Sequence, residues 1–316
     1  MADVVSDLGG TNVRFATVAA DGRTLTHVTS HPLTSFADFS SALTAYASGH
    51  LGDPTAVARI AIGAAGPVSN NRVQLTNAPW TIDAADLKSE LGCRARLVND
   101  LQAVASAIPH LTTDTLESWR GEPGSGDIAT TAIALNVGTG FGASALHTFT
   151  VGNVPTSHAA ATEAGHISLP LDYQDREPAP KPTSDGQASI EPATFEDVLS
   201  GRGLVELVAR TSGVRFDDAR AVIAAAGRPE VDRALAHFGW LAGRAARDLV
   251  LAHGAWGGIY LFGSVLEGWA EVADRASFFS GFDGPNPMAA PLSTVPVIQI
   301  KHPQAALVGL ISQLPK

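Results

Sequence analysis

The sequence predicts an α/β fold built from two halves that begin alike. The segments SDLGGTNVRFATV near the start and NVGTGFGASAL in the middle both read as a strand, a glycine turn and a returning strand. After each of them, apolar strand-like runs alternate with stretches of helical periodicity. We therefore expect two related α/β halves, with the boundary after the helix that Pro109 closes.

The first half opens with a meander of strands over residues 3–33, which includes a second hairpin turn at Asp21–Gly22. Apolar residues at helical spacing predict a helix over 36–51. A buried strand over 57–68, a capped helix over 81–92 and a strand over 95–100 follow. The next helix is expected to start at Leu101.

The second half repeats this pattern. Residues 126–153 predict a strand, a glycine turn and a returning strand, and residues 231–255 form the longest helical stretch. Residues 257–269 read as strand, glycine turn and helix, and 296–314 as a strand and an apolar helix. Residues 171–193 are rich in Pro, Ser and Asp, which predicts an exposed loop.

Composition limits the class of protein. The 316 residues are 45% hydrophobic and 16% charged, which is typical of a well-packed soluble protein. No apolar run reaches the roughly 18–20 residues that span a bilayer, and the first ten residues lack the features of a signal peptide. The single cysteine, Cys93, excludes an internal disulfide framework and a Cys-rich zinc site. These properties favour the cytoplasm and no membrane partner.

The charge balance argues against nucleic acid as a partner. With 21 Lys and Arg against 31 Asp and Glu, the formal net charge is −10, and no basic run is present. A surface that follows phosphates needs clustered Lys and Arg. A small molecule is therefore the expected partner.

The first glycine turn, Asp7 to Asn12, has the chemistry of a phosphate site. Gly9 and Gly10 would let backbone N–H groups approach a phosphate, and Thr11 and Asn12 add side-chain donors. Asp7 could hold a hydrated Mg²⁺. A tight hairpin turn containing an Asp explains the same residues, and the Walker pattern is absent.

A second turn supplies the same chemistry in the other half. Gly138, Thr139 and Gly140 suggest a second phosphate site, and the pair indicates two such sites that face each other across a cleft. A third turn, Gly263–Ser264, suits the nucleoside end of a nucleotide.

Asn99 and Asp100 end a strand and begin a helix. Asp100 could be the N-cap of that helix. It could also be the base that accepts a proton in phosphoryl transfer, with Asn99 holding a substrate hydroxyl. The two roles are compatible, because a cap can direct one oxygen at a ligand.

A further group of polar residues lies in the second half. Glu163 and His166 are three residues apart, which resembles metal-ligand spacing, but no other His or Cys completes a set. They also suit the hydroxyls of a sugar. Glu196 precedes a helix and could be only a capping acid.

The order of eight motifs resembles that of the proteobacterial-type glucokinases. They are SDLGGTNVRFA, AIGAAGPV, TNAPW, LVNDLQAVASAIP, NVGTGFG, EAGHISLP, FEDVLSGRGL and VPVIQIKHPQAALVG. The resemblance implies the actin-like, ribonuclease H-like ATPase fold, with a cleft between a small domain (1–109 and 300–316) and a large one (110–299). It further implies ATP, Mg²⁺, D-glucose as acceptor and a homodimer.

The resemblance also implies roles for individual residues. Asp100 matches the catalytic base, and the sugar-binding group comprises Asn77, Asn99, Glu163, His166 and Glu196. The nucleotide would contact the three glycine turns: Asp7, Gly9, Gly10, Thr11 and Asn12; Gly138, Thr139 and Gly140; and Gly263 and Ser264.

Three departures from the family pattern bear on function. Thr162, Glu163 and Ala164 replace a more glycine-rich run. Ser264 stands where the third turn usually has a second glycine, and the 171–193 loop replaces an apolar helix before Glu196. A kinase for another hexose and an inactive sugar-binding regulator on the same fold stay open. A ROK-type kinase would usually carry a Cys-rich zinc motif, and an Hsp70-like chaperone a peptide-binding domain, so both are disfavoured.

Overall fold

The computed structural model describes residues 1–75, 78–124, 130–169, 181–182, 188–189 and 193–316. The chain divides into two compact units. Unit 1 contains Met1–Leu116, Thr156–Ala161 and His302–Lys316, and unit 2 contains Glu117–Pro155 and Thr162–Lys301.

Unit 1 begins with the predicted meander and then alternates strands with helices. Its elements are β1 (Ala2–Leu8), β2 (Asn12–Val18), β3 (Leu25–Pro32), α1 (Phe39–Leu51), β4 (Val57–Ala64), β5 (Arg72–Gln74), β6 (Thr81–Asp83), α2 (Ala84–Leu91), β7 (Arg94–Asn99), α3 (Asp100–Ala107) and α11 (Ala305–Ile311). Short 3-10 turns occupy Leu33–Ser35, Ile108–His110 and Thr113–Thr115.

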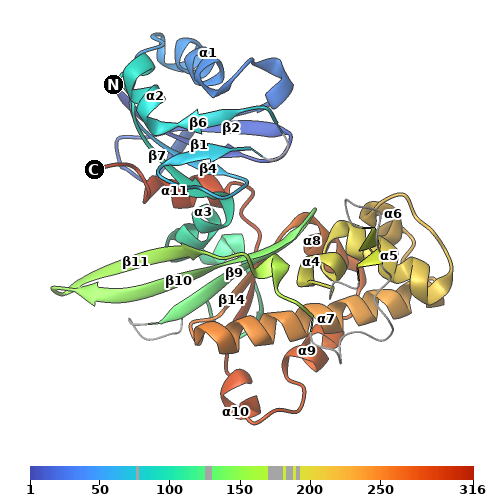
Figure 1. Ribbon diagram of the computed structural model, residues 1–316. Helices are drawn as coiled ribbons and strands as arrows, with labels where there is room; N and C mark the ends of the chain where they lie inside the picture. Colours follow the sequence, from blue (N-terminus) through green and yellow to red (C-terminus); the bar gives the residue numbers. More distant parts are fainter. Residues whose placement is uncertain (76–77, 125–129, 170–180, 183–187, 190–192) are drawn as a thin grey trace. The chain divides into compact units, whose positions relative to one another are not determined.

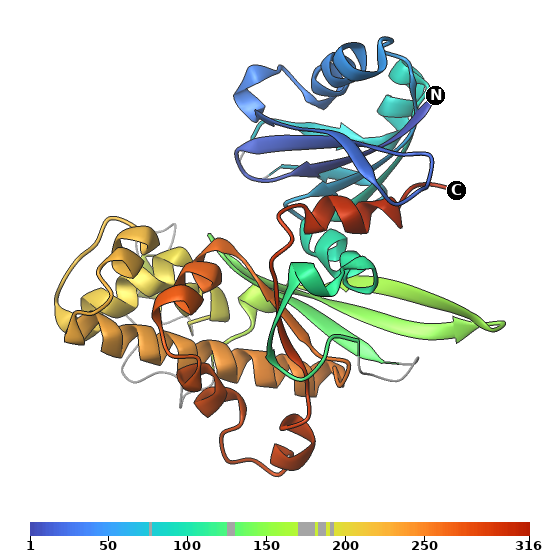
Figure 2. The same ribbon diagram turned by 180° about the vertical axis from the view of Figure 1, so that it is seen from behind.

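The sheet of unit 1 has the order β3-β2-β1-β4-β7 and a helical layer on each face (Figure 1). Apolar side chains of α1 and α2 pack on one face, where Phe15 stacks with Tyr46 at a centroid distance of 5.0 Å. On the other face α11 packs against α3, β1 and β4, and α3 and α11 lie side by side in Figure 2. Leu307 and Leu310 of α11 are buried there with Val5.

The direction of the strands brings three chain turns to one edge of this sheet. β1, β4 and β7 are parallel, and their register aligns Leu8 with Ala64 and Ala64 with Asn99. Leu8, Ala64 and Asn99 are the last residues of their strands, so the three strands end side by side. The turn after β1, the turn after β4 and the start of α3 therefore lie at the same carboxyl edge.

Unit 2 carries the second hairpin and most of the helices. Its elements are β8 (Leu116–Arg120), β9 (Thr131–Val137), β10 (Phe141–Val151), β11 (Val154–Ala161), a 3-10 turn (Ala164–His166), β12 (Lys181–Pro182), β13 (Ala188–Ser189), α4 (Phe195–Val198), α5 (Gly201–Ser212), α6 (Ala219–Ala224), α7 (Pro229–His253), β14 (Ile259–Phe262), α8 (Ser264–Val272), α9 (Ala276–Phe282), α10 (Ala289–Leu292) and β15 (Val297–Ile300). Two of these strands cross the boundary, because Leu116 of β8 and Thr156–Ala161 of β11 belong to unit 1.

The second sheet has the order β11-β10-β9-β14-β15-β8, and most of its residues belong to unit 2. β10 is antiparallel to β9, whereas β14 is parallel to both β9 and β15. Its first five strands thus follow the order of the unit 1 sheet, with a glycine turn between the two antiparallel strands in each case. The predicted repeat of two related halves is confirmed.

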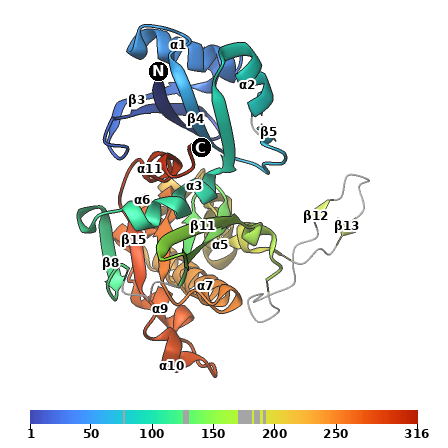
Figure 3. The ribbon, with the colours of Figure 1, turned by 90° about the vertical axis from the view of Figure 1, so that its left-hand side faces the viewer.

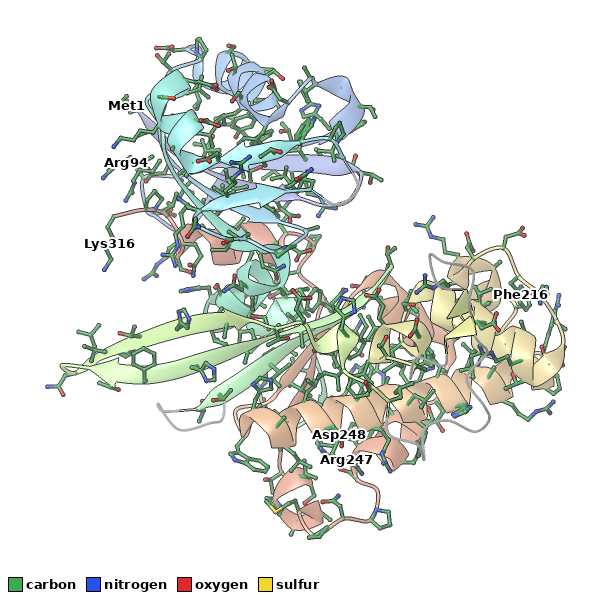
Figure 4. The ribbon with its side chains drawn as sticks, viewed as in Figure 1. Met1, Arg94, Phe216, Arg247, Asp248 and Lys316 are labelled. Carbon is green, nitrogen blue, oxygen red and sulfur yellow. The ribbon has the colours of Figure 1, made fainter. Side chains whose placement is uncertain are left out.

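The longest helix, α7, packs closely against α9 (Figure 3). A Cβ added at Gly243 would lie 1.9 Å from the carbonyl oxygen of Phe278, so only glycine permits this approach. α7 also carries the buried Arg247, whose Nε donates to Asp248 Oδ1 at 3.1 Å (Figure 4). Within the described ranges, no helix combines the length and apolar character needed to cross a membrane.

Candidate active site

The turn after β1 leaves open space beside its backbone. A Cβ at Gly9 would meet only the carbonyl oxygen of Asn12, at 4.0 Å. Gly10 and Thr11 are exposed, and Asn12 Nδ2 donates to Thr11 Oγ1 at 3.1 Å. Backbone and side-chain donors at such an exposed turn can bind an anion.

Asp7 is paired with an arginine that the sequence reasoning did not single out. The β1–β2 register places Arg14 directly opposite Asp7, and Arg14 Nη1 lies 3.3 Å from Asp7 Oδ2. The Asp7 side chain is 13% exposed and that of Arg14 is 48% exposed. Burial raises the pKa of the Asp7 carboxyl, and the Arg14 charge and hydrogen bond lower it in part.

The N-cap of α3 is Asn99, so the assignment of that role to Asp100 was wrong. Asn99 Oδ1 accepts the N–H of Leu101 at 3.0 Å, and Gln102 Oε1 accepts the N–H of Asn99 at 3.1 Å, which completes a capping box. The extended backbone at Asn99, φ −67° and ψ 149°, is what a cap requires. Asp100 is the first helical residue, and its Oδ1 also accepts the N–H of Leu101, at 2.9 Å.

Asn99 already has partners for part of its amide. Its Nδ2 donates to the carbonyl oxygen of Gly66 at 3.4 Å. An amide nitrogen has two hydrogens and an amide oxygen has two lone pairs. The Asn99 side chain also accepts the N–H of Gln102 in the capping box and makes a hydrogen bond with the Asp100 carboxylate. Asn99 is therefore tied both to the helix start and to Asp100.

Asp100 has the electrostatics of a general base. Burial, followed by the charge of Asp7, raises its pKa to about 6. Hydrogen bonds from the N–H groups of Leu101 and Asp100 itself, and one with Asn99, act in the opposite direction. A carboxylate with a pKa near 6 is ionised at neutral pH and is a stronger proton acceptor than an ordinary aspartate.

In unit 2, Glu196 packs into a space that two glycines leave open. Its Oε2 accepts the N–H of Phe141 at 3.2 Å. A Cβ at Gly140 would lie 2.6 Å from that oxygen, and one at Gly165 would lie 3.5 Å from it. The residue that caps α4 is Thr194, with Asp197 completing the capping box, so Glu196 is not merely a capping acid.

Glu163 and His166 flank Gly165 on a 3-10 turn, with exposed side chains. His166 Nε2 lies 4.0 Å from Glu163 Oε2, and the two side chains are 70% and 75% exposed. Gly165 between them is the residue that approaches Glu196. The structure thus brings Glu163, His166 and Glu196 into one region.

Backbone hydrogen bonds hold the two segments of this region together. The N–H of Leu169 donates to the carbonyl oxygen of Ala193 at 2.7 Å, and the N–H of Phe195 donates to that of Ile167 at 3.0 Å. The placement of Glu196 beside Gly165 is therefore fixed by residues on either side of 170–192. That interval contains most of the predicted 171–193 loop and, apart from the short strands β12 and β13, lies outside the described residues. Asn77 also lies outside them.

The second and third glycine turns meet within unit 2. A Cβ at Gly138 would lie 3.8 Å from the backbone nitrogen of Ser264. Gly263 has φ +108°, and a Cβ there would lie 2.6 Å from the carbonyl oxygen of Val137. The N–H of Gly201, at the start of α5, donates to the carbonyl oxygen of Gly138 at 2.9 Å. The starts of α5 and α8 therefore converge on the Gly138 turn.

A cavity of about 480 Å³ opens beside these turns. Its lining contains two of the predicted nucleotide-binding residues together with residues of α5, α6 and the segment between them. They are Thr139, Gly201, Arg202, Val205, Asp217, Asp218, Ala219, Arg220, Ile223, Ser264 and Val265. The sequence offers no reason to single out Gly201, and none for the lining residues that only the packing of α6 brings here: Asp217, Asp218, Ala219, Arg220 and Ile223.

No group of three or more His, Cys, Asp or Glu side chains that could hold a metal occurs in the described part of the chain. Mg²⁺ differs from metals that need such a group, because it keeps several waters and binds one or two carboxylates plus substrate phosphates. Asp7, a mostly buried carboxylate beside an open glycine turn, fits that requirement. The residues present therefore suit a hydrated Mg²⁺ that arrives with a phosphate.

The chain is similar to glucokinases over nearly its whole length. A model of the glucokinase family matches residues 4–315. The glucokinase of Paramagnetospirillum magneticum is 32% identical, over 97% of this chain and 95% of its own length. That of Rhizobium leguminosarum is 31% identical, over 98% and 90%.

Solved structures show the same similarity. A glucokinase from an Antarctic psychrotroph, 26% identical, superimposes with a TM-score of 0.80 over 99% of this chain and 98% of its own. Two structures share the fold at 19% identity. The Balamuthia mandrillaris glucokinase in complex with glucose has a TM-score of 0.74 over 98% and 92%, and the Streptomyces griseus ROK family glucokinase with glucose and AMPPNP has 0.60 over 99% and 99%.

These similarities and the two related sheets confirm the predicted actin-like fold with two α/β units. The match of the family model over residues 4–315 and the identity to glucokinases over nearly the whole chain establish the family. The chain belongs to the glucokinase family.

Proposed function

We propose that this protein transfers the γ-phosphoryl group of ATP to the 6-hydroxyl of D-glucose, with Asp100 as the general base. One observation carries the proposal: a half-buried carboxylate with a pKa of about 6 lies at the carboxyl edge of a sheet, beside an open glycine turn. Phosphoryl transfer needs an acceptor hydroxyl that is oriented and relieved of its proton.

The chemistry assigns one proton transfer to Asp100. Its carboxylate accepts the proton of the sugar hydroxyl as the oxygen attacks the γ-phosphorus, and the bond from that phosphorus to the bridging oxygen breaks to release ADP. Asn99, next to the base at the same edge of the sheet, would hold neighbouring sugar hydroxyls.

Unit 2 supplies the second set of sugar-binding groups in this proposal. Glu196 is held by the Phe141 N–H, and charged acceptors hydrogen-bond sugar hydroxyls strongly. Glu163 and His166, exposed on the adjacent turn, would bind the far edge of the ring. We include Asn77 in this group on the resemblance alone.

The nucleotide would use the glycine turns and the cavity of unit 2. The N-terminus of α8 favours phosphate oxygens, and the cavity has room for a nucleoside. Gly9, Gly10, Thr11 and Asn12 would bind the transferred end of the polyphosphate. Asp7 would hold Mg²⁺ through water, and the bound cation would neutralise phosphate charge. The solved relative with AMPPNP supports a nucleotide of this kind.

The remaining predictions belong to the same proposal. We propose that unit 1 is the small domain and unit 2 the large domain of the kinase. A homodimer and a cytoplasmic location stay predictions, and sedimentation velocity tests the first. No nucleic-acid partner is expected from the charge balance.

An ADP-release assay with ATP, Mg²⁺ and a panel of hexoses tests the proposal. Glucose should give the highest kcat/KM, and the product should be glucose 6-phosphate by phosphorus NMR. If fructose, mannose or an amino sugar is turned over faster than glucose, that sugar is the substrate and glucose is not. Sugar binding without turnover for any hexose would instead support a regulatory protein.

A further inference from the structure

Gln102 makes two hydrogen bonds to segments that are far apart in the sequence. Its Oε1 accepts the N–H of Asn99 at 3.1 Å, and its Nε2 donates to the carbonyl oxygen of Ala159 at 2.9 Å. Both partners are backbone groups, so one end of the amide must accept and the other must donate. Only a primary amide of this length satisfies both at once.

The first partner lies at the start of the helix that carries the base. Asn99 is the N-cap of α3 and Asp100 its first residue. A capping box restrains the backbone at the helix start, which is where the Asp100 side chain is attached. Gln102 thereby holds the peptide that orients the base.

The second partner lies just ahead of a sugar-binding segment. Ala159 is in β11, which ends at Ala161, where the chain passes from unit 1 into unit 2. Thr162 Oγ1 then donates to the carbonyl oxygen of Ala143 at 2.6 Å, and Glu163 follows directly. The chain leading into Glu163 is thus held at Ala159 by Gln102 and at Thr162 by β10.

We propose that Gln102 is a positioning residue for the sugar: it ties the start of α3, which carries Asp100, to the end of β11, which leads into Glu163 and His166. This inference rests on the proposed function, because it assigns both connected segments to one sugar. It adds a residue whose side-chain amide bonds to two backbone groups and so restrains two segments of the proposed sugar site.

The substitution Gln102→Glu separates the two bonds. A glutamate at the third helical position still accepts the Asn99 N–H, as in an ordinary capping box, but its carboxylate cannot donate to Ala159. Glucose should then bind about tenfold more weakly, both as KM and as the Kd from calorimetry, while the KM for ATP changes by less than about twofold. The thermal midpoint should stay within about 2 °C of the wild type.

Two further variants make the result specific. Gln102→Ala loses both bonds, so kcat should fall in addition to the weaker glucose binding. Gln313→Glu is the matched control, because Gln313 Nε2 donates to Ser106 Oγ of the same helix at 3.0 Å. It introduces the same charge against α3 and should leave glucose binding and kcat unchanged.

Because glucose binding is measured directly, the role of Gln102 can be tested separately from the proposed reaction. A wild-type protein that binds glucose without phosphorylating it would overturn the reaction and still permit the test of Gln102. Unchanged glucose Kd in Gln102→Glu, an equal loss of ATP affinity, or the same effect in Gln313→Glu would each overturn the positioning role.

Discussion

Asp7, near the end of β1, lies close enough to Asp100, the first residue of α3, for its charge to raise the pKa of the Asp100 carboxyl. The parallel arrangement of β1, β4 and β7 produces this proximity, because it brings both chain turns to one edge. Two carboxylates at one edge favour a base on one of them and a cation on the other.

The pH dependence of turnover should report the pKa of Asp100. That pKa is raised from 3.8 to about 6, so the base is protonated and inactive below this pH and ionised above it. The kcat/KM for glucose, measured at saturating ATP, should fall about tenfold per pH unit well below pH 6. A plateau that extends down to pH 4.5 would contradict the assignment.

The same shift predicts an effect on stability. A carboxyl whose pKa is higher in the folded state stabilises the fold only while protonated, and that contribution is lost as the pH rises from about 4 through about 6. Asp100→Asn should therefore raise the free energy of unfolding at pH 7.5, by ~3 kcal/mol at most, and much less at pH 4. Urea unfolding at both pH values measures this difference.

Asp86→Asn is the control for that measurement. Asp86 is an exposed acid in the first turn of α2, where a negative charge is mildly favourable. Its removal should slightly destabilise the protein at pH 7.5. Equal changes in the free energy of unfolding for both variants would argue against an energetic cost of the buried Asp100 charge.

Glu196 should determine sugar affinity. Glu196→Gln keeps the side-chain length and can still accept the Phe141 N–H, but it removes the charge that strengthens a bond to a sugar hydroxyl. The KM for glucose should rise about tenfold to a hundredfold, with the KM for ATP unchanged. Steady-state kinetics with each substrate varied in turn measures both KM values. A rise in the KM for ATP equal to that for glucose would contradict this role.

The cavity of unit 2 should determine nucleotide affinity. Ala219 lines it, so Ala219→Phe would place a ring inside and raise the KM for ATP at least tenfold, without weakening glucose binding in calorimetry. Ala224→Phe, at the exposed end of the same helix, is the matched control. The two variants should differ in ATP affinity and agree in glucose affinity.

Much of the fold followed from local patterns. The glycine turns at Gly9–Gly10 and Gly138–Gly140 and the start of a helix beside Asp100 depend on residues adjacent in sequence. The N-cap was misplaced by one residue because Asn and Asp both cap helices well, and the backbone angles at Asn99 decided between them. The register that pairs Asp7 with Arg14 follows from the hairpin and was available in the sequence.

Other parts of the site depend on packing between distant segments. Ala219, Arg220 and Ile223 reach the cavity only because α6 packs beside α5 and α8. The contact of Glu196 with Gly140 and Gly165 joins three segments that no periodicity relates. The bond from Gln102 to Ala159 spans 57 residues, although the capping-box spacing of Asn99 and Gln102 was visible.

The most direct test of the account is the turnover of Asp100→Asn with glucose, ATP and Mg²⁺, measured beside the calorimetric Kd for glucose. An amide cannot accept the hydroxyl proton, so kcat should fall by about 10²–10⁴-fold while the glucose Kd changes by less than about threefold. Turnover within a few-fold of the wild type would contradict the role of Asp100 as the base.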